Sequence, residues 1–162
     1  MNVAPGVVHY EISQVAMVVR DLEASMRDYN RRHGWGPWSI YEYEPPRLRN
    51  VLVRGQAAEL TWIGAETEVG AVWVELLQPV SGNAVFADWL DRHGEGVHHV
   101  GYWAKSGDEA TRIHDALAAA GADELLSAWI DDVYFFYMDT RPTVTEVWTG
   151  DLDSLRASRI YP

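Results

Sequence analysis

The sequence predicts an α+β fold in which one chain carries the element order β-α-β-β-β twice. Two stretches of strand-then-helix pattern begin near residues 12 and 97, and three further extended segments follow each of them. A chain of 162 residues that is 48% hydrophobic can bury a sufficient core without a metal or crosslink. We therefore expect residues 1–162 to form a single domain.

The first half opens with an alternating apolar segment over residues 12–19, the pattern of a half-buried strand. A helical pattern follows, in which Leu22 and Met26 lie on one apolar face. Asp21 is a candidate N-cap of this helix, and Gly34 is a candidate C-terminal glycine. The remaining extended segments of this half are 37–44, 47–64 with a break near Gly55, and 71–77, which Pro79 is expected to end.

The second half repeats this order after a connector. A short amphipathic helix, with Asn83 as its N-cap and Gly94 as its end, is expected to join the halves. The elements of the second half are expected at 97–104, at 108–120 as a helix that Gly121 stops, and at 124–130, 133–138 and 143–149. These boundaries give module one about 9–79, a connector about 80–95, module two about 96–150 and a C-terminal tail 151–162.

The two halves also agree in detail, which favours a duplication over a chance likeness of two amphipathic units. The interval from expected helix cap to expected stop is 13 residues in both. Superposing the first strands equates Gln14 with His99, and superposing the last strands equates Glu75 with Glu146. The repeat thus places polar side chains at matching positions of four strands.

All four of these residue types can bind a metal. Glu75 and Glu146 each stand in the middle of an otherwise apolar strand, where an unpaired buried carboxylate is costly unless a positive centre compensates it. Taken singly, each of the four could instead be a solvated or structural residue. Taken together, their symmetric placement favours a divalent cation. His98 is expected to point to the opposite face from His99 and not to bind the ion.

Composition excludes several classes of function. The chain has no cysteine, which rules out disulfides, thiol nucleophiles and cysteine-ligated clusters. Its net charge of −11, with scattered Lys and Arg, argues against a nucleic-acid or anionic-membrane surface. No signal-peptide pattern and no long apolar run occurs, so a cytoplasmic protein without a membrane span is expected.

Four segments carry a resemblance to a known family: QVAMVVRDLE at 14–23, VELLQP at 74–79, GVHHVG at 96–101 and TEVW at 145–148. They resemble the vicinal oxygen chelate superfamily, most nearly its methylmalonyl-CoA epimerase and glyoxalase I-like branch. The resemblance spans about residues 9–150. It implies the glyoxalase/bleomycin resistance/dioxygenase fold, in which two βαβββ modules form a curved mixed sheet around a metal-containing cavity. The ligands it implies are Gln14, Glu75, His99 and Glu146.

The ligand pattern departs from that of some relatives. Epimerases of the family usually have His at the position of Gln14 and Gln at the position of Glu75, whereas the order Gln, Glu, His, Glu resembles the zinc-type glyoxalase I. Extradiol dioxygenases hold iron with two His and one Glu, so Gln14 argues against that chemistry. Antibiotic-binding members lack this ligand set. One oxygen-rich site of this kind suits Zn, Ni, Co, Mn or Mg.

The resemblance and the ligand set together predict an isomerase or epimerase that moves a proton next to a carbonyl through a metal-stabilised enolate. Glu146 is the candidate base and Glu75 its symmetric partner. Glu42, Glu44 and Glu59 are further candidates on the strands expected to line the cavity. The alternatives are a lactoylglutathione lyase of the glyoxalase I type and a non-catalytic protein that binds a hydrophobic metabolite.

The expected substrate is a small carbonyl compound. Trp73, Trp103 and Trp148 share strand faces with the metal positions and would favour a flat, hydrophobic substrate, aromatic or polycyclic, although aromatics at strand spacing also build cores. A coenzyme A or glutathione carrier is neither demanded nor excluded. No nucleic acid or membrane is expected as a partner, and the family resemblance implies a homodimer.

Overall fold

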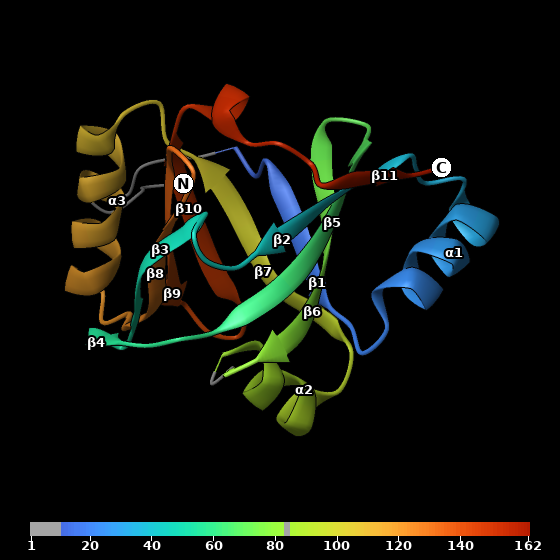
Figure 1. Ribbon diagram of the computed structural model, residues 1–162. Coiled ribbons are helices and arrows are strands. Elements are labelled where there is room, and N and C mark those ends of the chain that lie inside the picture. The colour runs from blue at the N-terminus through green and yellow to red at the C-terminus, as the bar shows by residue number, and fades with distance from the viewer. Residues whose placement is uncertain (1–10, 83–84) are drawn as a thin grey trace, which may run out of the picture.

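The computed structural model describes residues 11–82 and 85–162, in which eleven strands form one curved mixed sheet flanked by three helices (Figure 1). In chain order the strands are β1 (Gln14–Val18), β2 (Trp38–Tyr43), β3 (Leu48–Val53), β4 (Gln56–Ala57), β5 (Thr61–Val69), β6 (Val72–Ser81), β7 (Gly96–Trp103), β8 (Glu124–Ile130), β9 (Val133–Asp139), β10 (Val144–Gly150) and β11 (Arg159–Tyr161). The helices are α1 (Leu22–His33), α2 (Phe86–His93) and α3 (Gly107–Ala119), and η1 (Leu152–Ser154) is a 3-10 turn.

The pairing of the strands confirms the predicted duplication. β1 pairs in parallel with β6, and β7 pairs in parallel with β10. The first half then continues outward through β5 to β2, and the second half continues through β9 to β8. The halves meet where β1 and β7 run antiparallel at the centre of the sheet. Each half is therefore one βαβββ unit with the same internal strand order.

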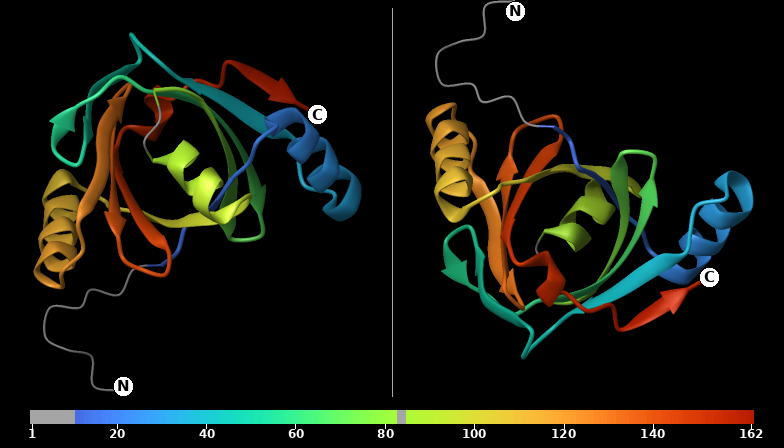
Figure 2. Two further views of the ribbon diagram at one scale, coloured as in Figure 1. Left: turned by 90° about the horizontal axis from the view of Figure 1, so that it is seen from below. Right: turned by 90° about the horizontal axis from the view of Figure 1, so that it is seen from above.

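One hairpin interrupts the repeat. The run expected over residues 47–64 is divided into β3, β4 and the start of β5. β3 does not join the sheet of its own half but pairs with β8, the outer strand of the second half. The chain crosses between the halves in the connection from β2 to β3, so that the sheet curls toward a closed ring (Figure 2).

Two of the helices cover the outer face of the sheet, as the alternation of the strands predicts. Met26 of α1 packs into a cluster with Val74 and Leu76 of β6. Ile113 of α3 packs into a second cluster with residues of β9 and β10. Helix α2 instead lies across one end of the curved sheet (Figures 1 and 2), where its Phe86 joins the largest apolar cluster.

Helix α1 begins and ends at the residues that the sequence predicted, whereas helix α3 begins at a different N-cap. Asp21 accepts a hydrogen bond from the backbone N–H of Ala24 at 2.9 Å, and Gly34 ends α1 with φ of 69°. In the second half Ser106, and not a residue at the expected start 108, is the N-cap, because its extended backbone lets its hydroxyl accept from the N–H of Glu109. Helix α2 ends at Gly94 as expected, whereas its expected cap Asn83 lies outside the described residues.

Strand β6 continues through Pro79 to Ser81 instead of ending at the proline. The β5–β6 register is irregular at this point, where Trp62 lies opposite Pro79 and Thr61 lies opposite Ser81. Such an irregularity accommodates a residue that has no N–H to donate to the ladder. The extra length carries the strand toward α2.

After β10 the chain returns to the first half. It passes through η1 and ends in β11, which pairs antiparallel with β2 so that Arg159 lies opposite Ile40 and Tyr161 lies opposite Trp38. The expected C-terminal tail is therefore an ordered strap between the two halves (Figure 1). Within the part of the chain that the structure describes, no helix has both the length and the apolar character needed to cross a membrane.

Candidate metal centre

The four side chains that the repeat equates come together at the centre of the sheet. Gln14, Glu75, His99 and Glu146 stand on β1, β6, β7 and β10, four neighbouring strands. Glu75 lies opposite the residue two positions after Gln14, and Glu146 lies opposite the residue two positions after His99. Equal register in both halves puts all four on the concave face. Each is at most 7% exposed.

The distances define a small polar cluster. The Nε2 atom of His99 lies 3.2 Å from Oε2 of Glu146 and 3.5 Å from Oε2 of Glu75. These three residues offer ligand atoms that all lie within 4.8 Å of one another. They form the one group of three or more histidine and acidic residues with such spacing in the described part of the chain.

Two buried atoms of the cluster lack hydrogen-bond partners. Neither Oε1 of Gln14 nor Nε2 of His99 forms a hydrogen bond of acceptable geometry, although both are inaccessible to solvent. A buried acceptor that loses its water without gaining a partner costs about 1–3 kcal/mol. One amide oxygen, one imidazole nitrogen and two carboxylates are donors for a divalent ion such as Zn, Ni, Co, Mn or Mg. The residues present therefore fit the metal that the fold family implies.

Two glycines make room for the cluster. A Cβ atom on Gly101 would lie 2.8 Å from Oε1 of Gln14 and 2.9 Å from its Cβ. A Cβ atom on Gly64 would lie 3.1 Å from Oε1 of Glu75 and 3.0 Å from a ring carbon of Tyr43. These contacts are shorter than ordinary van der Waals separations, so the side chains of the cluster occupy space that a larger residue would take.

Electrostatics favours proton retention in this cluster when no cation is bound. Burial raises the pKa of Glu75, and the neighbouring Glu146 adds to that rise. Burial alone would lower the pKa of His99, but the carboxylates of Glu146 and Glu75 together raise it to about 9. A divalent ion would have to displace these protons.

A further carboxylate, Glu66, faces the same cavity and was missed from the sequence. It stands on β5 directly opposite Glu75, and its Oε1 accepts a long hydrogen bond of 3.4 Å from Nε2 of Gln14. Burial raises its pKa well above the usual value, with Glu75 and Glu146 adding to the rise. The sequence could have indicated this position, because Trp62, Gly64 and Glu66 follow one another at every second residue and so share one strand face.

The other acidic candidates do not reach the site. Glu42, Glu44 and Glu59 are all exposed. The first occupies the solvent-facing side of β2, and the other two lie in the connections that flank the inserted hairpin. The expectation that they line the cavity is wrong, because Glu42 alternates along β2 with Tyr41 and Tyr43, which do line it, and because Glu44 and Glu59 lie outside the strands.

His98 also corrects a prediction. Ala16 pairs with His99 and Met17 pairs with Val97, so His98 is a bulged residue without a partner on β1. The bulge breaks the alternation of side chains, and His98 turns inward with His99 instead of pointing to the opposite face. The Nδ1 atoms of the two rings lie 2.9 Å apart. Burial lowers the pKa of His98 well below its usual value, and His99 and His93 lower it further.

The cluster opens into a cavity of about 220 Å³. Its wall is mainly aromatic and aliphatic, and it includes Tyr41, Tyr43, Trp73, Phe135, Tyr137 and Trp148. Trp73 and Trp148 thus line the cavity, as the sequence predicted. Trp103 does not belong to the lining; its ring packs at 5.2 Å against that of Trp148, its register partner. Among the described residues of this wall, the charged groups are the carboxylates Glu66, Glu75 and Glu146.

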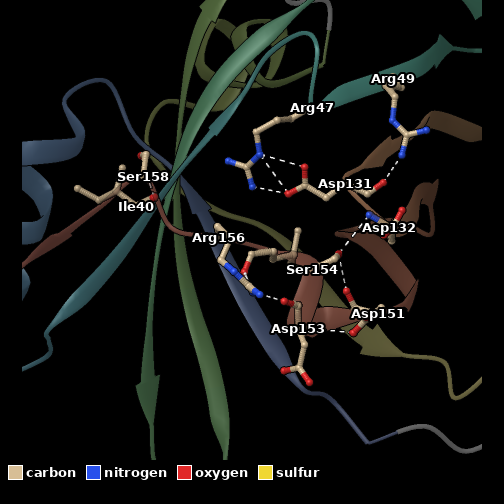
Figure 3. A network of polar contacts seen from close by, with 11 residues as sticks. Ile40, Arg47, Arg49, Asp131, Asp132, Asp151, Asp153, Ser154, Arg156 and Ser158 are labelled. Atoms are coloured by element: carbon tan, nitrogen blue, oxygen red, sulfur yellow. Dashed lines mark hydrogen bonds and ion pairs between the residues drawn. The ribbon is translucent and has the colours of Figure 1, made fainter.

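The C-terminal strap closes one side of this cavity. Leu152 and Leu155 belong to the lining. The strap is held by the Ser154 hydroxyl, which accepts from the backbone N–H of Asp132 at 3.2 Å, and by the N–H of Ser158, which donates to the carbonyl of Ile40 at 2.8 Å (Figure 3). Beside it, Nε of Arg47 donates to the carboxylate of Asp131 at 3.1 Å (Figure 3).

Fold and site together define a protein built from paired βαβββ modules with one buried, metal-compatible cluster at their junction. Residues 13–133 match the sequence profile of the Glyoxalase/Bleomycin resistance protein/Dioxygenase superfamily. The chain belongs to this superfamily, the vicinal oxygen chelate superfamily that the sequence motifs resembled. No curated protein matches the chain significantly.

Solved structures share the fold at low sequence identity. A hypothetical protein of Bacillus halodurans C-125 is 16% identical, with a TM-score of 0.62 over 92% of this chain and 100% of its own. A methylmalonyl-CoA epimerase variant of Streptomyces coelicolor, in complex with 2-nitronate-propionyl-CoA, is 19% identical, with a TM-score of 0.60 over 88% and 96%. The methylmalonyl-CoA epimerase of Mycobacterium tuberculosis is 16% identical, with a TM-score of 0.62 over 94% and 95%.

Proposed function

We propose that this protein is a divalent-metal-dependent isomerase or epimerase that transfers a proton at the carbon next to a carbonyl group. The observation that carries the proposal is the buried cluster of Gln14, Glu75, His99 and Glu146, in which one oxygen and one nitrogen have no hydrogen-bond partner. Structural neighbours that are epimerases lend support to the reaction class.

The residues that would hold the ion are Gln14, Glu75, His99 and Glu146. When bound, a divalent ion polarises a carbonyl oxygen and stabilises the negative charge that forms when an adjacent C–H loses its proton. The chain's own contribution is to present two carboxylates that offset the ionic charge and to surround the reacting carbon with an apolar wall. Because that wall excludes water, charge interactions inside it are stronger than in solvent.

Two carboxylates on opposite modules are assigned the proton transfer. Glu146, on β10, takes the proton from one face of the substrate carbon, as the sequence suggested. Glu75 was its predicted partner, but Glu66 is better placed for the second role because it lies in the cavity beside the cluster and outside the group of ligand atoms. A proton removed on one face and returned on the other inverts the carbon centre.

The cavity wall favours a neutral, hydrophobic carbonyl substrate, aromatic or polycyclic in class. Trp73 and Trp148 supply flat apolar surface next to the cluster. A substrate with a free carboxylate would face three acidic side chains and no cationic one among the described residues of the wall. The small volume admits the reacting part of such a molecule, with any larger portion extending through the mouth.

The first experiment measures metal content by elemental analysis of protein purified without a chelating tag. We expect near-stoichiometric divalent metal in the wild type and its loss in the double variant Glu75→Ala, His99→Ala. Hydrophobic ketones and thioesters are then incubated with loaded protein in heavy water, and deuterium entry at the α-carbon is followed by NMR.

Variants of the two candidate bases test their roles in the same exchange assay. Glu146→Gln and Glu66→Gln should each slow exchange by about 10²- to 10⁴-fold, as expected for loss of a positioned base. Glu68→Gln, an exposed position on the same strand as Glu66, is the matched control and should exchange at the wild-type rate. Activity that requires a glutathione adduct would indicate the lyase instead. Metal-independent binding of the same ketones, without exchange, would indicate a binding protein.

A further inference from the structure

We infer that His98 is a positioning residue that accepts a hydrogen bond from the Nδ1–H of His99 and so holds His99 with its Nε2 atom as a metal-binding nitrogen. The inference builds on the proposed function, because it concerns the ion that this function requires. It assigns a role to a side chain that belongs neither to the group of ligand atoms nor to the lining of the cavity.

The backbone provides the geometry. In a regular strand, neighbouring side chains point to opposite faces, and the rings of two consecutive histidines could not meet on one face. The bulge at His98 removes this alternation, and the Nδ1 atoms of His98 and His99 lie 2.9 Å apart, a hydrogen-bond distance. The hydroxyl of Thr143, the residue before β10, donates to the carbonyl of His98 at 3.0 Å and holds the bulge in place.

The direction of this hydrogen bond follows from what the other nitrogen of His99 does. Nε2 of His99 is directed at the carboxylates of Glu146 and Glu75, and His98 supplies the hydrogen bond made by the His99 ring within the described residues. A nitrogen that binds a cation offers its lone pair, so the ring proton must sit on Nδ1. That proton can only be donated to Nδ1 of His98, which must then be unprotonated.

The surroundings of His98 suit a neutral acceptor. Its ring is 1% exposed and packs edge-on against Phe86 at 5.2 Å and Trp89 at 4.9 Å, both from α2. A charged imidazolium would be costly among these rings. Helix α2, which covers one end of the curved sheet, thus holds in place the ring that orients a cluster ligand. Residues that orient metal ligands in this way typically change metal affinity by about 10- to 100-fold when they are replaced.

The test compares three variants. His98→Leu removes the acceptor and keeps an apolar side chain in the buried site, whereas His98→Asn keeps an oxygen near the position of the lost Nδ1. His33→Leu removes an exposed histidine of α1 that packs on Trp35 at 5.1 Å, and it is the matched control. Circular dichroism verifies folding, and zinc affinity is measured on chelator-treated protein by competition with a chromophoric chelator.

Zinc affinity should fall by about 10- to 100-fold in His98→Leu and should be largely restored in His98→Asn, with no change in His33→Leu. The second readout is the histidine ring ¹⁵N–¹H NMR spectrum of the zinc-loaded protein, assigned with His99→Ala. It should show the ring proton of His99 on Nδ1, protected from exchange in wild type and His98→Asn. Because it is measured on the wild-type protein, this readout tests the direction of the hydrogen bond between the two histidines even if His98→Leu fails to fold.

The outcomes separate the inference from the proposed function. Unchanged zinc affinity in folded His98→Leu, or a His99 ring that carries its proton on Nε2 in loaded protein, overturns the inference and leaves the function standing. The expected affinities and spectra with no proton exchange on any carbonyl compound support the inference and count against the function. A wild-type protein that binds no zinc, nickel, cobalt, manganese or magnesium overturns both.

Discussion

At the residue scale, the cluster depends as much on absent side chains as on those present. Gly101 lies opposite Gln14 in the β1–β7 pair, and its missing Cβ is the space that the Gln14 side chain fills. Its backbone φ lies outside the left-handed region, so alanine would fit the backbone and fail only in the space available. The substitution therefore isolates packing at the site.

We predict that Gly101→Ala displaces Gln14 from the cluster. Overpacking of this kind costs about 1–3 kcal/mol of folding free energy, and metal affinity should fall because one of the four ligands moves. Gly107→Ala is the control, since a Cβ there meets no atom within 4 Å. Isothermal titration with zinc and urea unfolding measure the two effects, and wild-type affinity in Gly101→Ala would show that Gln14 is not a ligand.

The protonation of His99 predicts how pH acts on the metal-free protein. Folding raises the pKa of His99 from 6.5 to about 9, with Glu146 and Glu75 outweighing the effect of burial. The protonated ring therefore stabilises the fold fully below pH 6.5, and this stabilisation is lost as the pH rises toward about 9. The raised pKa values of Glu66 and Glu75 act in the same direction, since ionising a buried carboxylate favours unfolding.

Urea unfolding of chelator-treated protein across this pH range should thus show stability falling with pH. His99→Gln should flatten the slope. Zinc affinity should change in the opposite sense and rise with pH, because the ligands must lose their protons to bind. A metal-free protein that gains stability between pH 6.5 and about 9 would contradict the assignment of these charges.

At the scale of elements, the repeat was predictable because both halves show the same order of strand and helix periodicities, although the N-cap of α3 was not identified from the sequence. Asp21 caps α1 and Ser106 caps α3 through the same kind of side-chain hydrogen bond to the N–H three residues later. The strands that carry the four cluster residues were likewise predictable from alternation and from the match between halves. Elements whose partners are remote in sequence were not predictable in this way.

His98 and Glu66 show why the pairing of strands that are remote in sequence could not be predicted. His98 was placed on the wrong face because a bulge depends on the strand opposite it, and nothing in the local sequence shows that β7 carries one extra residue relative to β1. Glu66 was missed because the β3–β4 hairpin separates β2 from β5, so that the strand equivalent to β9 could not be identified among several extended segments. Both errors come from pairing, which only the folded sheet specifies.

The equivalence of the two caps can be tested. Asp21→Ala and Ser106→Ala should each destabilise the protein by about 1 kcal/mol, because each leaves one helix N–H without its acceptor. Equal shifts in the urea midpoint, without change in the denaturant slope, would support the equivalence of α1 and α3. A shift in only one variant would show that the two helices contribute unequally to the common transition.

At the scale of the whole molecule, each half supplies two of the four cluster residues. The cluster lies at the junction of β1 and β7, so a bound ion would join the halves across their shared seam. Metal binding and cooperative folding are therefore expected to be linked.

We predict that zinc at about 100 times its dissociation constant stabilises the fold by about 2.7 kcal/mol and leaves one unfolding transition. Scanning calorimetry with and without chelator measures this. The variant Glu75→Ala, His99→Ala, which loses one ligand from each half, should show no zinc effect. Two separate transitions in the metal-free protein would instead mean that the halves fold independently.

The antiparallel β1–β7 seam also has a historical consequence. A single βαβββ unit carries one residue of the proposed ligand set on its first strand and one on its last, which is half of the proposed coordination sphere. An unduplicated ancestor could have completed the sphere only by associating with a second copy about a twofold axis at this seam. Gene duplication and fusion would turn such a concentration-dependent encounter into a covalent arrangement and would free the two copies to diverge, one toward glutamine and the other toward histidine.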